Sequence, residues 1–552
     1  MNRTRKVLKK AAAGFAASAL VLSGGSTVFA AASYQEAEKA ALDKLVSGAE
    51  AYLDTYAEEL DKAKAGSNAA VTLTAEDAGK SLLGMMTGMD FSWLNTISMD
   101  MDVSIKDSIE AMAADLLVND TALCTMNAMI DMSNLTEYLQ IPELSPSWVI
   151  LPMTFTTVDE YGTERADEAM QQYFQTMSDI MNVIPDSATV GTLLDRYGNI
   201  IIDNMTEGAS VEEEVSVEGI SEECTAYEAQ ITEADLNTIL EEVLTTAKDD
   251  QELKALFDSW AEAGAAEEDS YTQFQAGIEE LLADIAEEDP ESEAGALVSR
   301  LWTNGDGKIV GRELSVSEGT DSIPVFTWKQ PSQDGNSALL IEISTGTDSM
   351  TLTGSGQSAE GLLNGNYIFA SNGVEAAHFA VENLETKPEK TGYINGTITV
   401  SFPNNGTEEN PNPLAGFGAV IAIISDAEAE TSQIDLTITS SGAPLATLSI
   451  SEGYGEGVET TDPSSLDDVL SVESDEDMLA YIQGMDWSSL LENAKAAGIP
   501  EELVTQIDAA LQAAVDEASS PEASADSGLT EEPAEGAAEE TAPAESEDGA
   551  AA

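Results

Sequence analysis

The sequence predicts an α+β fold in which a large curved antiparallel β-meander forms a half-barrel-like sheet with helices packed on one face. Apolar and polar residues alternate from Ile97 to Lys106 with the period of a half-buried strand, and three further strand-like segments follow before Pro142. From residue 296 the pattern returns as about ten strands, separated by the Gly, Asn, Asp and Pro residues that hairpin turns favour.

The composition allows a sizeable core and excludes some classes of partner. Hydrophobic residues make up 43% of the chain, and 102 acidic residues against 22 basic ones give a net charge of −80. Such a chain repels nucleic acid and anionic membrane surfaces, so we expect neither as a partner. The excess of carboxylates otherwise indicates a solvated acidic surface.

Residues 1–30 have the pattern of a secretory signal peptide. A basic start between Arg3 and Lys10 precedes an apolar stretch, and small residues allow cleavage after Ala30 or Ala32. The apolar stretch is shorter than a membrane span, and no later run reaches about 18 apolar residues. We therefore expect a bacterial export signal, a secreted or extracellular protein, and no transmembrane segment after cleavage.

The remaining chain divides into four predicted parts, which differ in composition and periodicity. Residues 31–66 form an N-terminal helix, and residues 67–458 form the antiparallel sheet domain with a helical insert at about 159–290. Residues 474–516 are predicted as a C-terminal helical pair. Residues 517–552 form an acidic tail of Ala, Glu and Pro that is expected to be disordered.

Local signals set the expected limits of several elements. Thr74 and Thr232 each begin a capping-box pattern at the start of a helix. A helix is expected over residues 159–183, within the insert. The apolar run at residues 414–424 fits either a buried strand or a helix.

Residues 302–313 carry most of the pattern of a calcium-binding loop. Asn304 and Asp306 occupy ligand positions and Gly307 occupies the turn position, but Trp302 stands where the first carboxylate is required. Asn-Gly-Asp-Gly between two strand-like segments instead predicts a β-hairpin. We therefore expect no metal site here.

Signals for catalysis are weak. The one histidine, His378, lies in a predicted strand, and no serine has the Gly-x-Ser-x-Gly surroundings of a nucleophile elbow. The carboxylates are too numerous to single out a pair for glycoside hydrolysis. Cys124 and Cys224 leave open one disulfide or two separate thiols. We expect no enzymatic activity, no cofactor and no metal.

The methionines are concentrated in one part of the sequence. Fourteen of the 18 lie between Met85 and Met205. Methionine is flexible and polarisable, so it suits surfaces that accept irregular apolar partners, although it also fills ordinary cores. The candidate residues for an apolar ligand groove are Met99, Met101, Met112, Met126, Met129 and Met132.

The order of these segments resembles a known group of proteins. Residues 138–142 (Tyr-Leu-Gln-Ile-Pro) and 306–311 (Asp-Gly-Lys-Ile-Val-Gly) are similar to stretches of uncharacterised secreted proteins of Gram-positive bacteria. A signal peptide, a helix and a long antiparallel meander together resemble the bacterial lipoprotein carriers. The resemblance extends over residues 71–451 and implies a half-barrel sheet that holds lipid on its concave side.

The leading expectation is a secreted, non-catalytic binding protein that holds an apolar or lipid-like ligand between helices and the methionine-rich sheet face. One alternative is a structural or protein-interaction module of the cell envelope, with the acidic tail as a spacer. Another is a hydrolase based on carboxylates. The expected partner is an apolar ligand or an extracellular protein, and the oligomeric state is left open.

Overall fold

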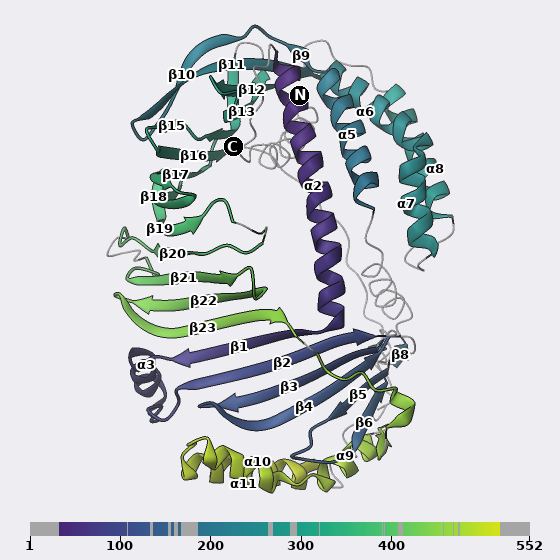
Figure 1. Cartoon of the computed structure of the whole chain (residues 1–552), viewed down its shortest axis with the longest axis vertical. Helices are drawn as coiled ribbons and strands as arrows, with labels where there is room; N and C mark the ends of the chain where they lie inside the picture. Colours follow the sequence, from purple (N-terminus) through teal and green to yellow (C-terminus); the bar gives the residue numbers. More distant parts are fainter. Residues whose placement is uncertain are drawn as a thin grey trace, which may run out of the picture.

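The computed structural model describes residues 33–106, 109–132, 136–152, 156–158, 164–166, 186–262, 269–287, 295–318, 321–388, 390, 392–406, 412–455, 457–466, 468–472 and 475–518. The predicted signal peptide lies outside these residues, as does the predicted tail beyond Ala518. The described part is built on one open, mostly antiparallel 22-stranded sheet with helices beside it (Figure 1). The predicted α+β class and sheet architecture are confirmed.

The four-stranded meander predicted near the N-terminus is present and continues into two further strands. Each strand pairs antiparallel with the next one along the chain. The strands are β1 (Ser67–Ala75), β2 (Thr96–Lys106), β3 (Ile109–Val118), β4 (Thr121–Asp131), β5 (Thr136–Gln140) and β6 (Trp148–Pro152).

A second, longer antiparallel run begins after residue 210, and short strands β9 (Thr206–Glu207) and β15 (Ser332–Gln333) pair beside it. Its strands are β10 (Val211–Val217), β11 (Ile220–Thr232), β12 (Ala296–Asn304), β13 (Ile309–Glu318), β14 (Asp321–Lys329), β16 (Asn336–Ser344), β17 (Ser349–Ala359), β18 (Leu362–Ser371), β19 (Val374–Glu385), β20 (Gly396–Ser401), β21 (Phe417–Asp426), β22 (Thr431–Ser440) and β23 (Ala443–Tyr454).

Strand β1 joins the two runs into one sheet. It pairs with β2 on one side and with β23 on the other, so that Val71 lies between Met99 and Ile450. At the far edge, β24 (Val469–Ser471) pairs in parallel with β6. Segments that are almost 400 residues apart in sequence therefore share one hydrogen-bonded surface.

The long helix α2 (Tyr34–Ala65) lies beside the sheet and runs from the region of β11–β13 to the start of β1 (Figure 1). The Ser33 side chain caps its first turn, and Gly66 ends it as predicted. Helix α5 (Ser187–Asp203) packs along α2, where Gly198 allows close contact because a Cβ there would lie 2.6 Å from Leu42.

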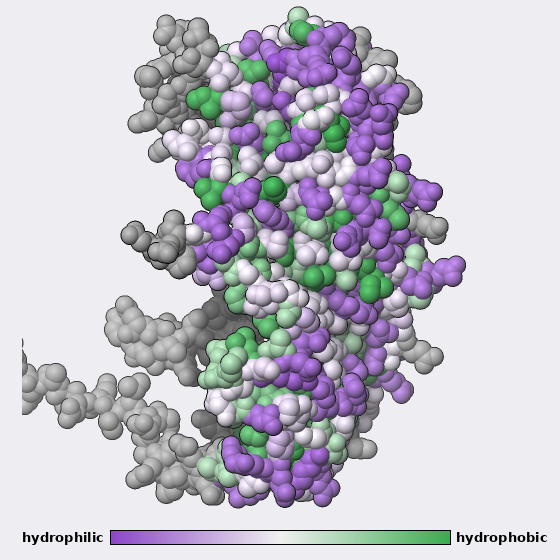
Figure 2. All heavy atoms as spheres, turned by 90° about the vertical axis from the view of Figure 1, so that its left-hand side faces the viewer, coloured by the Kyte–Doolittle hydropathy of each residue, from purple (hydrophilic) through white to green (hydrophobic). Residues whose placement is uncertain are grey.

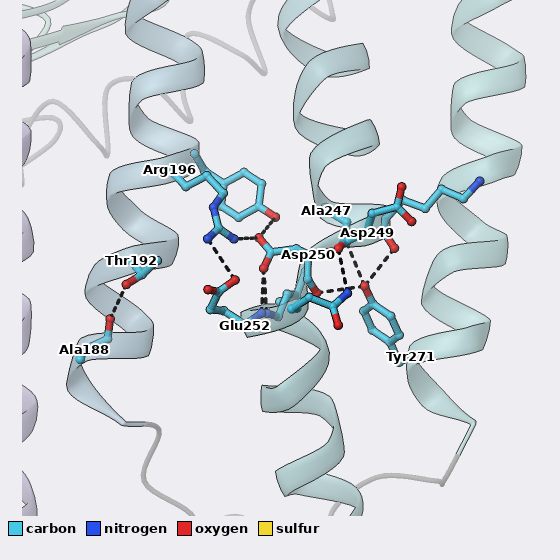
Figure 3. A network of polar contacts seen from close by, with 12 residues as sticks. Ala188, Thr192, Arg196, Ala247, Asp249, Asp250, Glu252 and Tyr271 are labelled. Atoms are coloured by element: carbon cyan, nitrogen blue, oxygen red, sulfur yellow. Dashed lines mark hydrogen bonds and ion pairs between the residues drawn. The ribbon is translucent and has the colours of Figure 1, made fainter.

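Three more helices lie beyond α5: α6 (Glu233–Asp249), α7 (Gln251–Glu262) and α8 (Ser270–Glu287). They meet around Asp250, whose buried carboxylate accepts hydrogen bonds from Arg196 and Tyr197 (Figure 3). The Tyr271 hydroxyl donates to the backbone oxygen of Asp250 at 3.1 Å. These contacts hold the four helices together at one point.

The largest core cluster joins the first turns of α2 to the sheet. Glu38 on α2 forms an ion pair with Arg312 on β13, and each side chain is only 4% exposed. The Tyr34 hydroxyl donates to Ser299 at 2.6 Å. The apolar members around these polar groups are Tyr34, Ala37, Ala41, Tyr227, Ala229, Leu301, Ile309, Leu314, Phe326 and Trp328.

Several local predictions need correction. The capping box at Thr74 is wrong, because Thr74 continues β1 between two pairing strands, and helix α3 (Asp77–Thr87) starts after Glu76 without a side-chain cap. The helix predicted over residues 159–183 is wrong at β8 (Glu164–Ala166), which pairs with β7 (Thr156–Val158), since strand pairing there satisfies the backbone. The rest of that predicted helix lies outside the described residues.

Other local predictions are resolved. The capping box of Thr232 and Asp235 is present in full, and the ambiguous apolar run forms strand β21. The predicted β12–β13 hairpin is present, with Asn304 accepting from the backbone of Lys308. The C-terminal pair, α10 (Trp487–Ala496) and α11 (Glu501–Ala518), follows a third helix, α9 (Asp475–Gly484).

Candidate ligand-binding face

One face of the sheet, here called the inner face, is the side that contacts α2. It is defined by Leu301, Leu314 and Phe326, which pack against the first turns of α2. Directly paired residues on neighbouring strands point to the same side, so the register carries this definition across the sheet.

Two uninterrupted rows of apolar side chains cross the inner face between β3 and β19. Neighbours in each row are direct cross-strand partners, and each row is apolar on every strand that it crosses. The first row is Leu116, Met99, Val71, Ile450, Ile434 and Ile423. The second row is Val118, Ile97, Leu73, Leu448, Leu436, Ile421, Ile398 and Val381.

The opposite, outer face is mostly polar on β2, β1, β23 and β22. The row next to those two consists of Ser98, Thr72, Ser449 and Asp435, again as direct partners. Figure 2 shows the left-hand side of Figure 1, where α3 and the ends of several strands lie, and hydrophobic residues there occur in small groups among hydrophilic ones. The continuous apolar surface is therefore a property of the inner face.

Helix α2 covers only part of the inner face. Its buried residues all lie between Tyr34 and Leu42, and farther along the helix Tyr52 and Tyr56 stack on each other with exposed rings. In the uncovered region Ile450 is 45% exposed and Ile434 is 44% exposed. Side chains that the alternating pattern predicts to be buried are therefore exposed to solvent.

The far end of α2 is held by a group of charges. Lys62 and Lys390 both bond to Glu430, at 2.9 and 2.6 Å, and these hydrogen bonds lower the pKa of the Glu430 carboxyl. Lys62 also lies over the ring of Tyr454, 5.9 Å from its centroid. Helix α2 is therefore fixed at its two ends, while its middle passes beside the inner face.

Two cavities lie along this face. One, of about 280 Å³, is lined by inner-face side chains of β16–β20, including Leu339, Tyr367, Phe379 and Ile398. The other, of about 480 Å³, lies between the end of α2 and the first residues of β1. A larger cavity of about 880 Å³ near the β10–β11 turn is lined mainly by polar groups such as Gln357.

The structure brings four of the six candidate methionines onto the inner face. Met99, Met101, Met112 and Met126 share it through β2, β3 and β4. Met99 is 37% exposed and the other three are half-buried.

The other two candidates lie elsewhere. Met129 pairs with Ala111 on the outer face and is only 4% exposed, so it is outside the groove. Met132 follows the last residue of β4 and is half-buried. Sequence reasoning missed the larger part of the surface, because the branched aliphatic residues of β1 and β20–β23 line it with no methionine among them.

The two cysteines and the histidine, which are the remaining candidates for catalysis or metal binding, lie on different strands. Cys124 and Cys224 are both free thiols, and burial raises the pKa of Cys224 to about 12. His378 is exposed on β19 and lies 3.1 Å from Glu375. Among the described residues, no group of three or more His, Cys, Asp or Glu is arranged to hold a metal ion.

Comparisons with protein-family models, curated proteins and solved structures gave no match. Within the described ranges, no helix combines the length and hydrophobicity needed to cross a membrane. The inner face is therefore interpreted from its own geometry.

Proposed function

We propose that this protein is a secreted, non-catalytic binding protein that holds an apolar or lipid-like ligand against the inner face of its sheet. The observation that carries the proposal is the pair of continuous apolar rows, whose central members, such as Ile450 and Ile434, are exposed beside α2. Burying apolar surface contributes about 25 cal/mol per Å², so covering these side chains supplies a driving force for binding.

The dimensions of the surface suit an extended hydrocarbon chain. The first row crosses six adjacent strands, which at the usual strand spacing is about 24 Å. One leaflet of a bilayer contributes about 15 Å of hydrocarbon, half of the usual core thickness. An acyl chain of ordinary length therefore fits along the row. Export rests on the pattern of residues 1–30, which stays a prediction.

Replacing Ile450 by glutamate is expected to weaken binding of a fluorescent fatty acid at least about tenfold. The new carboxylate would stand between Val71 and Ile434, where an apolar ligand would deprive it of water without pairing it. Because Ile450 is 45% exposed in the free protein, the substitution leaves the fold intact. A fluorescence titration of the purified protein measures the change.

The matched control is Ser451→Glu, one residue along the same strand on the outer face, beside Ala70 and Gln433. It adds the same charge to the same strand and is expected to bind the probe like the original protein. Equal affinities for the two variants, or no binding by the original protein after lipid extraction, would contradict the proposal.

A further inference from the structure

Helix α3 exposes a compact apolar surface outside the two rows of the inner face. The side chains of Leu82, Leu83, Met85, Met86 and Met89 are all exposed, with Met85 at 78% and Met86 at 75%. Residues 81–89 contain no charged side chain in a chain whose net charge is −80. Adjacent, uncharged and exposed apolar residues of this size mark interaction surfaces.

The way α3 is attached explains why these side chains face outward. Its first turn lies against β23, where the backbone nitrogen of Glu76 donates to Leu445 at 3.1 Å. Gly79 makes the contact so close that a Cβ would lie 2.0 Å from the Leu445 oxygen. The helix therefore rests on its small residue, and the large residues of the next two turns remain unpacked.

Helix α3 lies at one end of the inner face, because it connects β1 to β2. Leu73 is the last large inner-face residue before α3, and Ile97 is the first one after it. These two residues are direct cross-strand partners, and both are exposed. Leu73 and Ile97 therefore bring the second row to the base of α3, and the acidic residues between β1 and β2 are Glu76, Asp77 and Asp90.

We propose that α3 docks the protein on the surface of an uncharged lipid bilayer, at the end of the inner face where a ligand enters or leaves. Methionine and leucine adapt to the irregular packing of acyl chains. A second copy of the chain is a poor occupant, because it would bring another 80 negative charges against the first. The docking of α3 does not depend on the proposed function. Only the transfer of an apolar ligand between the bilayer and the inner face rests on it.

Flotation with phosphatidylcholine vesicles tests the docking. The full chain is expected to float with the vesicles, and the double variant Met85→Ser with Met86→Ser is expected to bind them at least about tenfold more weakly. The control pair is Leu281→Ser with Ile424→Ser, which removes two apolar side chains on α8 and β21 that are 52% and 53% exposed. This pair should float like the original chain.

Binding of a soluble fluorescent fatty acid separates the docking from the proposed function. The methionine variant should keep that binding, whereas Ile450→Glu should lose it and still float. Failure of the original chain to float, equal flotation of the methionine variant, or a dimer that the methionine substitutions abolish would each overturn the docking. Flotation without binding of the soluble probe would overturn the carrier function alone.

Discussion

Replacing Arg312 by alanine is expected to cost about 3–5 kcal/mol of stability, the usual loss when one partner of a buried ion pair is removed. Arg312 lies on β13 and Glu38 lies on α2, and a bidentate contact joins them, with one nitrogen–oxygen distance of 2.9 Å. Each side chain is 4% exposed, so the remaining carboxylate would stay buried without a cation.

The surroundings of this pair increase the loss. Tyr34 lies next to Glu38, and burial raises the pKa of the Tyr34 phenol. The surroundings therefore disfavour any charge other than the Glu38–Arg312 pair, whose two charges compensate each other. The same residues form the contact between α2 and the largest core cluster. We therefore expect the first turns of α2 to separate from the sheet in the variant.

Urea denaturation and hydrogen exchange over residues 34–65 measure this effect. Lys39→Ala, which removes a solvent-exposed ion pair with Asp203, is the control and should change stability by less than about 1 kcal/mol. Replacing both Glu38 and Arg312 by methionine should restore most of the stability, because no charge then stays buried alone. A loss for Arg312→Ala as small as that of the control would contradict the expectation.

The sheet was predictable because alternation is a local signal. The segment from Ile97 to Lys106 places one class of side chain on each side of a strand, and a one-residue change of register would reverse every side chain. The role of β1 was not predictable, because pairing with β23 joins residues separated by almost 400 positions. No local pattern encodes which distant edge a strand will meet.

The candidate site was predictable in part for the same reason. Alternation assigned Met99, Met101 and Met126 to one face, and the register places them there. Periodicity shows which side chains share a face but not whether another element covers that face. The exposure of Ile434 and Ile450 follows from where α2 stops contacting the sheet, and that is a tertiary property.

The buried charges are only weakly indicated by the sequence pattern. Arg312 and Leu314 lie two positions apart on β13 and therefore share the inner face. Glu38 lies among the alanines of an apolar stripe on α2. A polar residue at a core position predicts that a partner exists, because an unpaired buried charge is costly. It does not identify a partner that is 274 residues away.

Replacing Asp250 by alanine is expected to destabilise the helices α5–α8 locally by about 2–4 kcal/mol. The Asp250 side chain has no exposed surface and bonds to both Arg196 and Tyr197. It also accepts from the backbone nitrogens of Glu252 and Leu253, at 3.0 and 3.1 Å, which caps the start of α7. Alanine would remove all four contacts. Figure 3 shows those with Arg196 and Glu252.

Asp250→Asn separates the contribution of the helix cap from that of the negative charge. The amide oxygen still caps α7, while the charge-assisted bond with Arg196 is lost, so about 1–2 kcal/mol is expected. Asp258→Asn, in an exposed pair with Lys254, is the control and should cost less than about 0.5 kcal/mol. Hydrogen exchange should report loss of protection over residues 186–287, with β1 and β2 unchanged.

The same carboxylate makes the helices sensitive to acid. Burial alone would raise the pKa of Asp250, but hydrogen bonds from Arg196, the Leu253 backbone and Tyr197 outweigh it and lower the pKa to about 2. Because the folded pKa lies below the unfolded value of about 3.9, the stabilisation is complete above that value and disappears as the pH falls through about 2. Protection of residues 186–287 should therefore decrease between pH 4 and 2 in the original chain, and less so in Asp250→Asn. Identical acid profiles for the two proteins would show that this carboxylate does not control the packing of α5–α8.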